Sequence, residues 1–168
     1  MLKSLFAGVG ALLLAVAPAA ACTNISSATV PMTACVSEEW QQAEATGAQE
    51  FSYNTADGNF GLMVITEKEV FTASTFRDAI VQNAITGNGG DASLVKVVGE
   101  RVETIDGKAW NVVEYEVQYQ GSPLTFQNFY YTQPGFGSVQ ILGYSLTSMA
   151  TSAAWKAGMF AGTIKMGS

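Results

Sequence analysis

The sequence predicts an α+β fold in which an antiparallel β-sheet meander is flanked by helices. Three observations support this prediction. Lys108 to Gln120 alternates apolar and polar residues, Asp106-Gly107 is a strong hairpin signal, and apolar residues recur at helical spacing after Thr75. An antiparallel sheet with helices packed on it accommodates this order of elements.

The first 21 residues have the pattern of a cleavable signal peptide. Lys3 gives a short basic start, Leu5 to Val16 is almost wholly apolar, and Ala19-Ala20-Ala21 forms a small-residue cleavage site. The apolar run is shorter than the about 20 residues that a membrane-spanning helix needs. We therefore expect residues 1–21 to be removed and the protein to be periplasmic or secreted, with a bacterial periplasm favoured.

Two interpretations of Cys22 stay open at this point. In the first, Cys22 forms a disulfide with Cys35 in an oxidising compartment. In the chain-entropy model, closing this loop stabilises the folded protein by roughly 3 kcal/mol. In the second, Cys22 is acylated and the protein is a membrane-anchored lipoprotein, although Ala19 stands where such lipoboxes usually carry Leu. The disulfide is favoured because lipidation would leave Cys35 without a partner.

The charge of the chain excludes some classes of partner. The whole sequence has a net charge of −6; without Lys3 it keeps seven basic and 14 acidic residues, a net charge of −7. This argues against nucleic acid and anionic membrane surfaces, which require basic patches. No charged residue occurs from Val117 to Trp155. That stretch fits either central strands with neutral outer faces or a partner-binding surface.

The N-terminal part of the mature chain has little pattern. Residues 22–36 are small and polar, include Pro31, and are predicted to be irregular. Ser37 is expected to cap a short helix that continues through Gln41. Residues 37–168 are predicted to form a single α+β domain, because the length after the signal peptide is typical of one domain.

The remaining elements follow from apolar periodicity and turn residues. In the predicted helix that Thr75 caps, Phe76, Ile80 and Ala84 share one face. The predicted elements are, in chain order, strands at 50–55 and 60–66, a helix from Thr75 to the Gly87–Asp91 loop, strands at 94–105, 108–120, 124–132 and 137–146, and a helix at 148–161. The last helix is expected to be capped by Thr147 or Ser148 and to carry Met149, Ala153, Trp155 and Phe160.

A family resemblance extends over about residues 50–166. The run from Val98 to Ala109, the alternating strand Val113-Glu114-Tyr115-Glu116, the aromatic strands after it and the closing amphipathic helix resemble the PsbP-like fold. That fold occurs in photosystem accessory proteins, a nuclear-import factor and bacterial envelope proteins of the DcrB type. The sequence departs from it at Trp40, which follows Ser-Glu-Glu where the family often has an apolar-Pro-x-Gly-Trp segment.

The resemblance implies an α/β/α sandwich that acts as a binding or assembly module, usually without catalysis, and it transfers no functional residue to this chain. The alternative fold is the cone of the nuclear-transport-factor-like family, which also pairs helices with a curved antiparallel sheet. Its helices cluster at the N-terminus, unlike the helix predicted here at 148–161.

Catalytic chemistry is sparse in the sequence. The absence of histidine removes Ser-His and Cys-His nucleophilic triads and His-ligated zinc. Glu114 and Glu116 lie on one strand face about 6–7 Å apart, a spacing that the catalytic carboxylate pairs of glycosidases have, but a solvated strand face explains them equally well. We predict no catalytic, cofactor-binding or metal-binding residue, and a protein that is not an enzyme.

Aromatic side chains of the β region are the candidate binding surface. We select Tyr119, Phe129, Tyr131 and Tyr144 from this set. The favoured function is an exported protein-interaction or assembly module of the bacterial cell envelope, with an unknown protein partner. The alternative is a small-molecule or lipid carrier that uses a cleft between sheet and helix. No membrane span is expected in the mature chain, and membrane contact only if Cys22 is lipidated.

Overall fold

The computed structural model describes residues 21–119 and 121–167. The predicted signal peptide lies outside the described residues, apart from Ala21. Of the two α-helices within the described ranges, neither has the length and apolar character that crossing a membrane requires.

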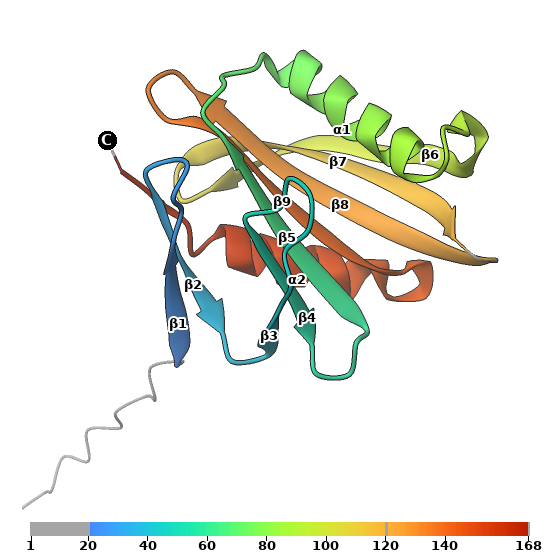
Figure 1. Ribbon diagram of the computed structural model, residues 1–168, viewed down its shortest axis with the longest axis horizontal. Coiled ribbons are helices and arrows are strands. Elements are labelled where there is room, and N and C mark those ends of the chain that lie inside the picture. The colour runs from blue at the N-terminus through green and yellow to red at the C-terminus, as the bar shows by residue number, and fades with distance from the viewer. Residues whose placement is uncertain (1–20, 120, 168) are drawn as a thin grey trace, which may run out of the picture.

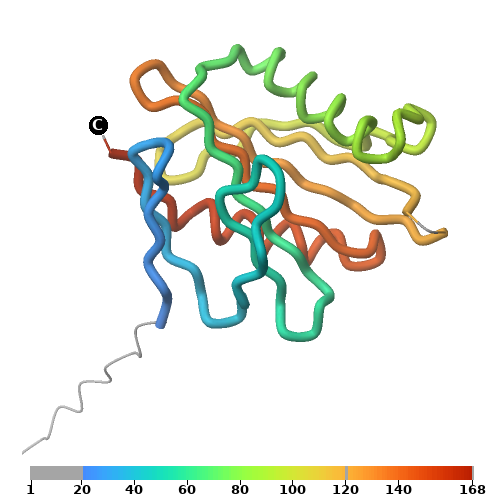
Figure 2. The backbone as a smooth tube through the Cα atoms, viewed as in Figure 1, coloured from blue at the N-terminus to red at the C-terminus, as the bar shows by residue number. Residues whose placement is uncertain are grey.

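A seven-stranded antiparallel sheet forms the middle layer of the molecule, with its strands in the order β3-β4-β5-β9-β8-β7-β6. Helix α1 (Ala73–Gly87) lies on one face, and α2 (Ala150–Ala161) lies on the other, together with a three-stranded sheet of order β1-β2-β10 (Figures 1 and 2). The predicted α+β class with helices on an antiparallel sheet is therefore confirmed. The strands are β1 (Cys22–Ser26), β2 (Met32–Ser37), β3 (Trp40–Ala43), β4 (Phe51–Thr55), β5 (Phe60–Glu67), β6 (Val95–Ile105), β7 (Lys108–Tyr119), β8 (Ser122–Gln133), β9 (Gly137–Leu146) and β10 (Lys165–Met166).

The meander from β6 to β9 forms where the sequence predicts it. At the β6–β7 turn Asp106 has φ of 48° and Gly107 has φ of 74°, the left-handed pair that a two-residue hairpin of the primed type needs. Strand β9 then pairs with β5 rather than ending the sheet, so β5 lies in the interior of the sheet. The chain reaches β6 from β5 through α1, which crosses over the sheet.

The two faces of the sheet hold separate cores. On the α2 side, the core joins the sheet to α2 and to the strand β2 through residues such as Leu62, Ile141 and Phe160. On the α1 side, Phe76 and Ile80 of the helix pack on Val113, Tyr115 and neighbouring side chains of β7 and β8. Both helices are thus held by apolar burial of one face.

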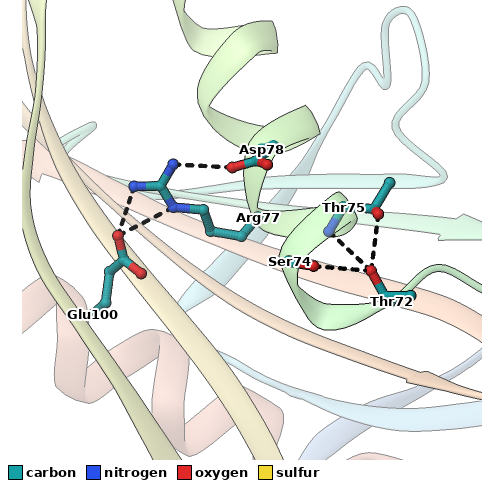
Figure 3. A network of polar contacts seen from close by, with 6 residues as sticks. All are labelled: Thr72, Ser74, Thr75, Arg77, Asp78 and Glu100. Carbon is teal, nitrogen blue, oxygen red and sulfur yellow. Dashed lines mark hydrogen bonds and ion pairs between the residues drawn. The ribbon is translucent and has the colours of Figure 1, made fainter.

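The N-cap of α1 lies three residues before the predicted one. Thr72, not Thr75, is the N-cap, and its Oγ1 accepts a hydrogen bond from the Thr75 backbone N–H at 3.1 Å (Figure 3). In the next turn the Arg77 guanidinium donates to Glu100 of β6 through Nη2 at 2.6 Å and to Asp78 through Nη1 at 3.1 Å. The start of α1 is therefore fixed to the outer strand of the sheet.

The N-terminal segment predicted to be irregular is instead a hairpin of β1 and β2. Alternate residues of β2, namely Met32, Ala34 and Val36, are buried against the main sheet and α2, and this burial orders a segment of weak propensity. A disulfide joins Cys22 to Cys35 across the hairpin with the Cα atoms 5.5 Å apart. Of the two alternatives for Cys22, the structure therefore contains the disulfide.

The prediction of a short helix from Ser37 to Gln41 is also wrong, because strand β2 ends and strand β3 begins in this part of the chain. Trp40 begins strand β3, which pairs with β4, and this residue is 9% exposed within the α2-side core. Tertiary burial of one large side chain thus outweighs the local helix signal.

At the other end of the chain, α2 has no side-chain cap, because a 3₁₀ turn at Thr147–Met149 leads into it. Trp155, one of the residues that the predicted helix carries, is 62% exposed. The buried residues of α2 are Ala153, Ala157, Phe160 and Ala161, and Trp155 lies on the opposite side of the helix.

Candidate functional site

A cleft lies between the C-terminal end of α1 and the sheet, with a volume of about 320 Å³. This is at the lower end of the size range of small-molecule sites. Five elements contribute its walls, and none of the ten described residues that line it is charged. We call it the aromatic cleft; its lining is Met63, Ala84, Gly87, Asn88, Tyr115, Val117, Tyr119, Leu124, Phe126 and Tyr144.

Three aromatic rings form a row along one wall of the cleft. Tyr115, Phe126 and Tyr144 occupy paired positions on β7, β8 and β9. The ring centroids are 5.2 Å apart between Tyr115 and Phe126 and 5.5 Å apart between Phe126 and Tyr144, with interplanar angles of 13° and 24°. Such offset stacking stabilises the row beyond its apolar burial. Strand pairing alone therefore places three rings side by side.

The row continues over β5 because that strand carries a glycine at the right position. A Cβ on Gly61 would lie 2.0 Å from the Tyr144 ring, so only glycine leaves space for the ring to lean across the strand. The Tyr144 hydroxyl then reaches β4 and donates a hydrogen bond to Asn54 Oδ1 at 3.3 Å. Gly61 and Asn54 thus fix the orientation of the outermost ring.

The end of α1 forms the opposite wall. Ala84 and Gly87 lie in the last turn of α1, and Asn88 is its C-cap. The Asn88 side-chain Nδ2 donates to the Ala84 carbonyl at 2.8 Å, which keeps this amide folded back on the helix. The helix therefore offers the cleft small side chains and a C-terminal end.

Burial controls the ionisation of the tyrosines in the cleft. Burial raises the pKa of the Tyr115 phenol to about 12, and the neighbouring Asn128 side chain opposes the rise only in part. Burial also raises the pKa of Tyr144. Both phenols are therefore neutral at physiological pH, and the cleft is an uncharged, mostly apolar space.

The structure divides the four aromatic residues selected from the sequence. Tyr119 and Tyr144 both line the aromatic cleft. Phe129 is 1% exposed in the core on the α2 side and cannot be part of a binding surface. Tyr131 is partly buried on that same side, near Trp110 and Phe136.

The residues chosen from the sequence do not include Tyr115 and Phe126, two of the three rings of the aromatic row. The alternation of side chains along β8 is the signal that could have found Phe126. Phe126 and Phe129 are three residues apart on this strand, so their side chains point to opposite faces of the sheet. This alternation does not show which residues of different strands lie side by side. The row of three rings could therefore be found only from the register of β7, β8 and β9.

Two other features bear on function. Trp155 and Met159, one turn apart on α2, are 62% and 57% exposed; we call them the α2 patch. Grooves of about 230 and 380 Å³ flank them, one beside the disulfide and one beside β6. Glu114 and Glu116, the considered carboxylate pair, are both partly exposed, and Glu114 lies 3.5 Å from Arg101 in an ion pair.

Comparisons with known proteins agree on the fold and go no further. No protein-family model matches the sequence, and no curated protein matches it. Among solved structures, cyanobacterial PsbP (CyanoP) from Synechocystis sp. PCC 6803 is similar with a TM-score of 0.62 at 12% identity, over 94% of this chain and 98% of that one. The chain has a PsbP-like fold, as the sequence predicts.

Two further structures support this likeness. The Ran-binding protein Mog1p of Saccharomyces cerevisiae gives a TM-score of 0.60 at 12% identity, over 87% of this chain and 96% of that one. LpqN of Mycobacterium tuberculosis, described as involved in cell envelope biogenesis, gives 0.52 at 11% identity, over 85% and 88%. At such identities the likeness concerns the fold alone.

Proposed function

We propose that this protein is an exported, non-catalytic binding module that carries a small organic molecule in the aromatic cleft. The observation behind the proposal is the uncharged cleft of about 320 Å³ with its row of stacked rings. Ligand sites are typically concave and apolar with a few polar groups, which matches this lining. The cleft between sheet and helix favours the carrier alternative over the assembly role that the sequence favoured.

The chemistry of the cleft supports binding rather than catalysis. Its lining contains no carboxylate, thiol or amine, and the chain contains no histidine. Tyr115 keeps its proton at neutral pH because burial raises its pKa to about 12, so it is a poor general base. Export is supported by the signal-peptide pattern and by the Cys22–Cys35 disulfide, which is typical of oxidising compartments.

A fluorescent probe and two matched variants of α1 test this proposal. N-phenyl-1-naphthylamine, a neutral dye that brightens in apolar sites, should bind the wild-type protein. Ala84→Trp fills the cleft and should weaken binding at least tenfold, whereas Ala79→Trp, on the exposed side of the same helix, should leave it unchanged. Failure of the wild type to bind would overturn the proposal, and equal binding by Ala84→Trp would place the site elsewhere.

A second candidate function is a protein-interaction module of the cell envelope. The α2 patch favours it, because an exposed Trp and Met beside two grooves resemble the anchors of protein interfaces. The envelope role described for LpqN is consistent with it.

Native mass spectrometry of protein purified gently from its own envelope fraction separates the two candidates. A small adduct lost in Ala84→Trp supports the carrier, and a protein-sized adduct lost in Trp155→Ala supports the interaction module. A wild-type spectrum of the bare chain alone would count against both as stable functions.

A further inference from the structure

We infer that the aromatic cleft selects an organic cation, a quaternary ammonium group above all, over a neutral or anionic molecule of the same shape. The inference rests on the proposed function and names the ligand class of the same site. Three features of the cleft support it: ring faces, the polarity of a helix end, and the state of its hydrogen-bond donors.

The first feature is the density of aromatic rings. Tyr115, Phe126 and Tyr144 are stacked in a row, and Tyr119 adds a fourth ring to the lining. The faces of aromatic rings carry partial negative charge and attract cations within about 6 Å of the ring centre. A cation in the cleft would therefore gain an interaction that a neutral molecule of equal shape lacks.

The second feature is the C-terminal end of α1. Gly87 is the last residue of this 15-residue helix, and both it and the C-cap Asn88 line the cleft. The C-terminal end of a helix carries the negative end of its dipole. The last turn of α1 has no basic side chain to neutralise it. The helix end therefore adds to the negative potential of the ring faces.

The third feature is that the cleft offers little to an anion. No Lys or Arg is among its described lining residues, and the chain has 14 acidic against eight basic residues. One N–H of the Asn88 side chain donates to the Ala84 carbonyl and the Tyr144 hydroxyl donates to Asn54, so neither of these two hydrogens is available to a ligand. An anion that entered the cleft would lose hydration and would meet no positively charged side chain in the lining.

Three molecules of one shape test the inference: choline, its uncharged carbon isostere 3,3-dimethylbutan-1-ol, and the anion 3,3-dimethylbutanoate. Each is titrated into the whole mature protein and followed by NMR chemical shifts. We expect choline to bind about tenfold more tightly than the alcohol, as ring–cation attraction in a partly desolvated site allows. The carboxylate should bind most weakly.

Two variants separate ring–cation attraction from apolar contact. Phe126→Leu and Tyr119→Leu keep apolar volume in the cleft but remove a ring face, so each should lower the preference for choline over the alcohol while the alcohol still binds. Tyr119 is 53% exposed, so its replacement leaves the core intact. Trp155→Leu makes the same kind of change on the far side of the sheet and should keep the full preference.

The outcomes distinguish the preference for a cation from the proposed carrier function. Equal affinity for choline and the alcohol, or a preference that survives both ring substitutions, overturns the inference while the carrier function stands. Tightest binding of the carboxylate overturns it as well, as does failure of all three to bind a protein that still binds the naphthylamine dye. Failure of the dye to bind overturns the carrier function itself.

Discussion

The two faces of the seven-stranded sheet differ in how completely they are covered. On one face, α2 and the three-stranded sheet enclose a continuous core that includes Leu62 and Ile141, both 0% exposed. On the other, α1 lies over β6, β7 and β8, whereas β3, β4 and β5 lie beyond its span (Figure 1). We infer that the first face supplies stability and the second supplies a site that a ligand can enter without disturbing the main core.

Strand β8 contains this difference within four residues. Phe129 points to the covered face and is 1% exposed, whereas Phe126 points to the other face and lines the aromatic cleft. Two residues of one type on one strand therefore have different roles, decided only by the alternation of side chains.

The largest expected effect comes from truncating these two side chains. Phe129→Ala should lower the free energy of unfolding by about 3–5 kcal/mol, because it leaves a cavity in a closed core. Phe126→Ala should cost about 1–2 kcal/mol, because the side chain is only partly buried. Urea denaturation followed by circular dichroism measures both. Equal losses would show that the two faces contribute alike and would break the comparison.

Removal of the disulfide tests whether the covered face is independent of the cleft. The bond holds β1 to β2, which covers the α2-side core. Replacing both Cys22 and Cys35 by Ser should cost roughly 3 kcal/mol, from the freedom regained by the unfolded chain. Binding of the naphthylamine dye at a temperature where the variant is folded should not change; a weakened affinity would mean that the two faces are coupled.

The pH dependence of stability reports on the α1 face. The pKa of Tyr115 is about 12 in the folded protein against 10.0 when free, so its contribution is complete below about pH 10 and is lost as the pH rises to about 12. A difference of this size corresponds to about 2–3 kcal/mol. Unfolding measured between pH 9 and pH 12 should show this decline, and Tyr115→Phe should flatten it. An unchanged slope in the variant would assign the decline to other groups.

The smallest effect concerns the start of α1, away from the cleft. Thr72→Ala removes the N-cap hydrogen bond to the Thr75 N–H and should cost about 1 kcal/mol. Thr151→Ala, at an exposed position of α2, serves as the control and should change stability by less than about 0.5 kcal/mol. Thermal unfolding compares the two, and a larger loss from the control would contradict the assigned cap.

Much of the fold could be predicted because its local signals agree with its final packing. The Asp106-Gly107 turn and the alternation of β7 are fixed within the chain, and β9 has the predicted bounds of 137–146. The β1–β2 hairpin and β3 could not be predicted, because Met32, Val36 and Trp40 are ordered by burial against distant elements. The pairing of β9 with β5 likewise depends on which strand fills the centre of the sheet.

Less of the site could be predicted, because it depends on register and on what a helix leaves uncovered. The sequence pointed to Tyr119 and Tyr144, but also to Phe129 and Tyr131 on the opposite face. A row such as Tyr115, Phe126 and Tyr144 exists only through the pairing of three strands. The small residues that leave space for it, such as Gly61, have no signal of their own in the sequence.

The central claim is that one face of the sheet is closed and the other binds a ligand. A methyl NMR titration with the naphthylamine dye tests this claim most directly. Met63 and Leu62 are neighbours on β5 that point to opposite faces, the first into the cleft and the second into the closed core. We predict shifts at the methyl groups of Met63, Val117 and Leu124, with those of Leu62 and Ile141 unmoved. Shifts confined to Met159 of the α2 patch, or an equal response of Leu62 and Met63, would contradict the account.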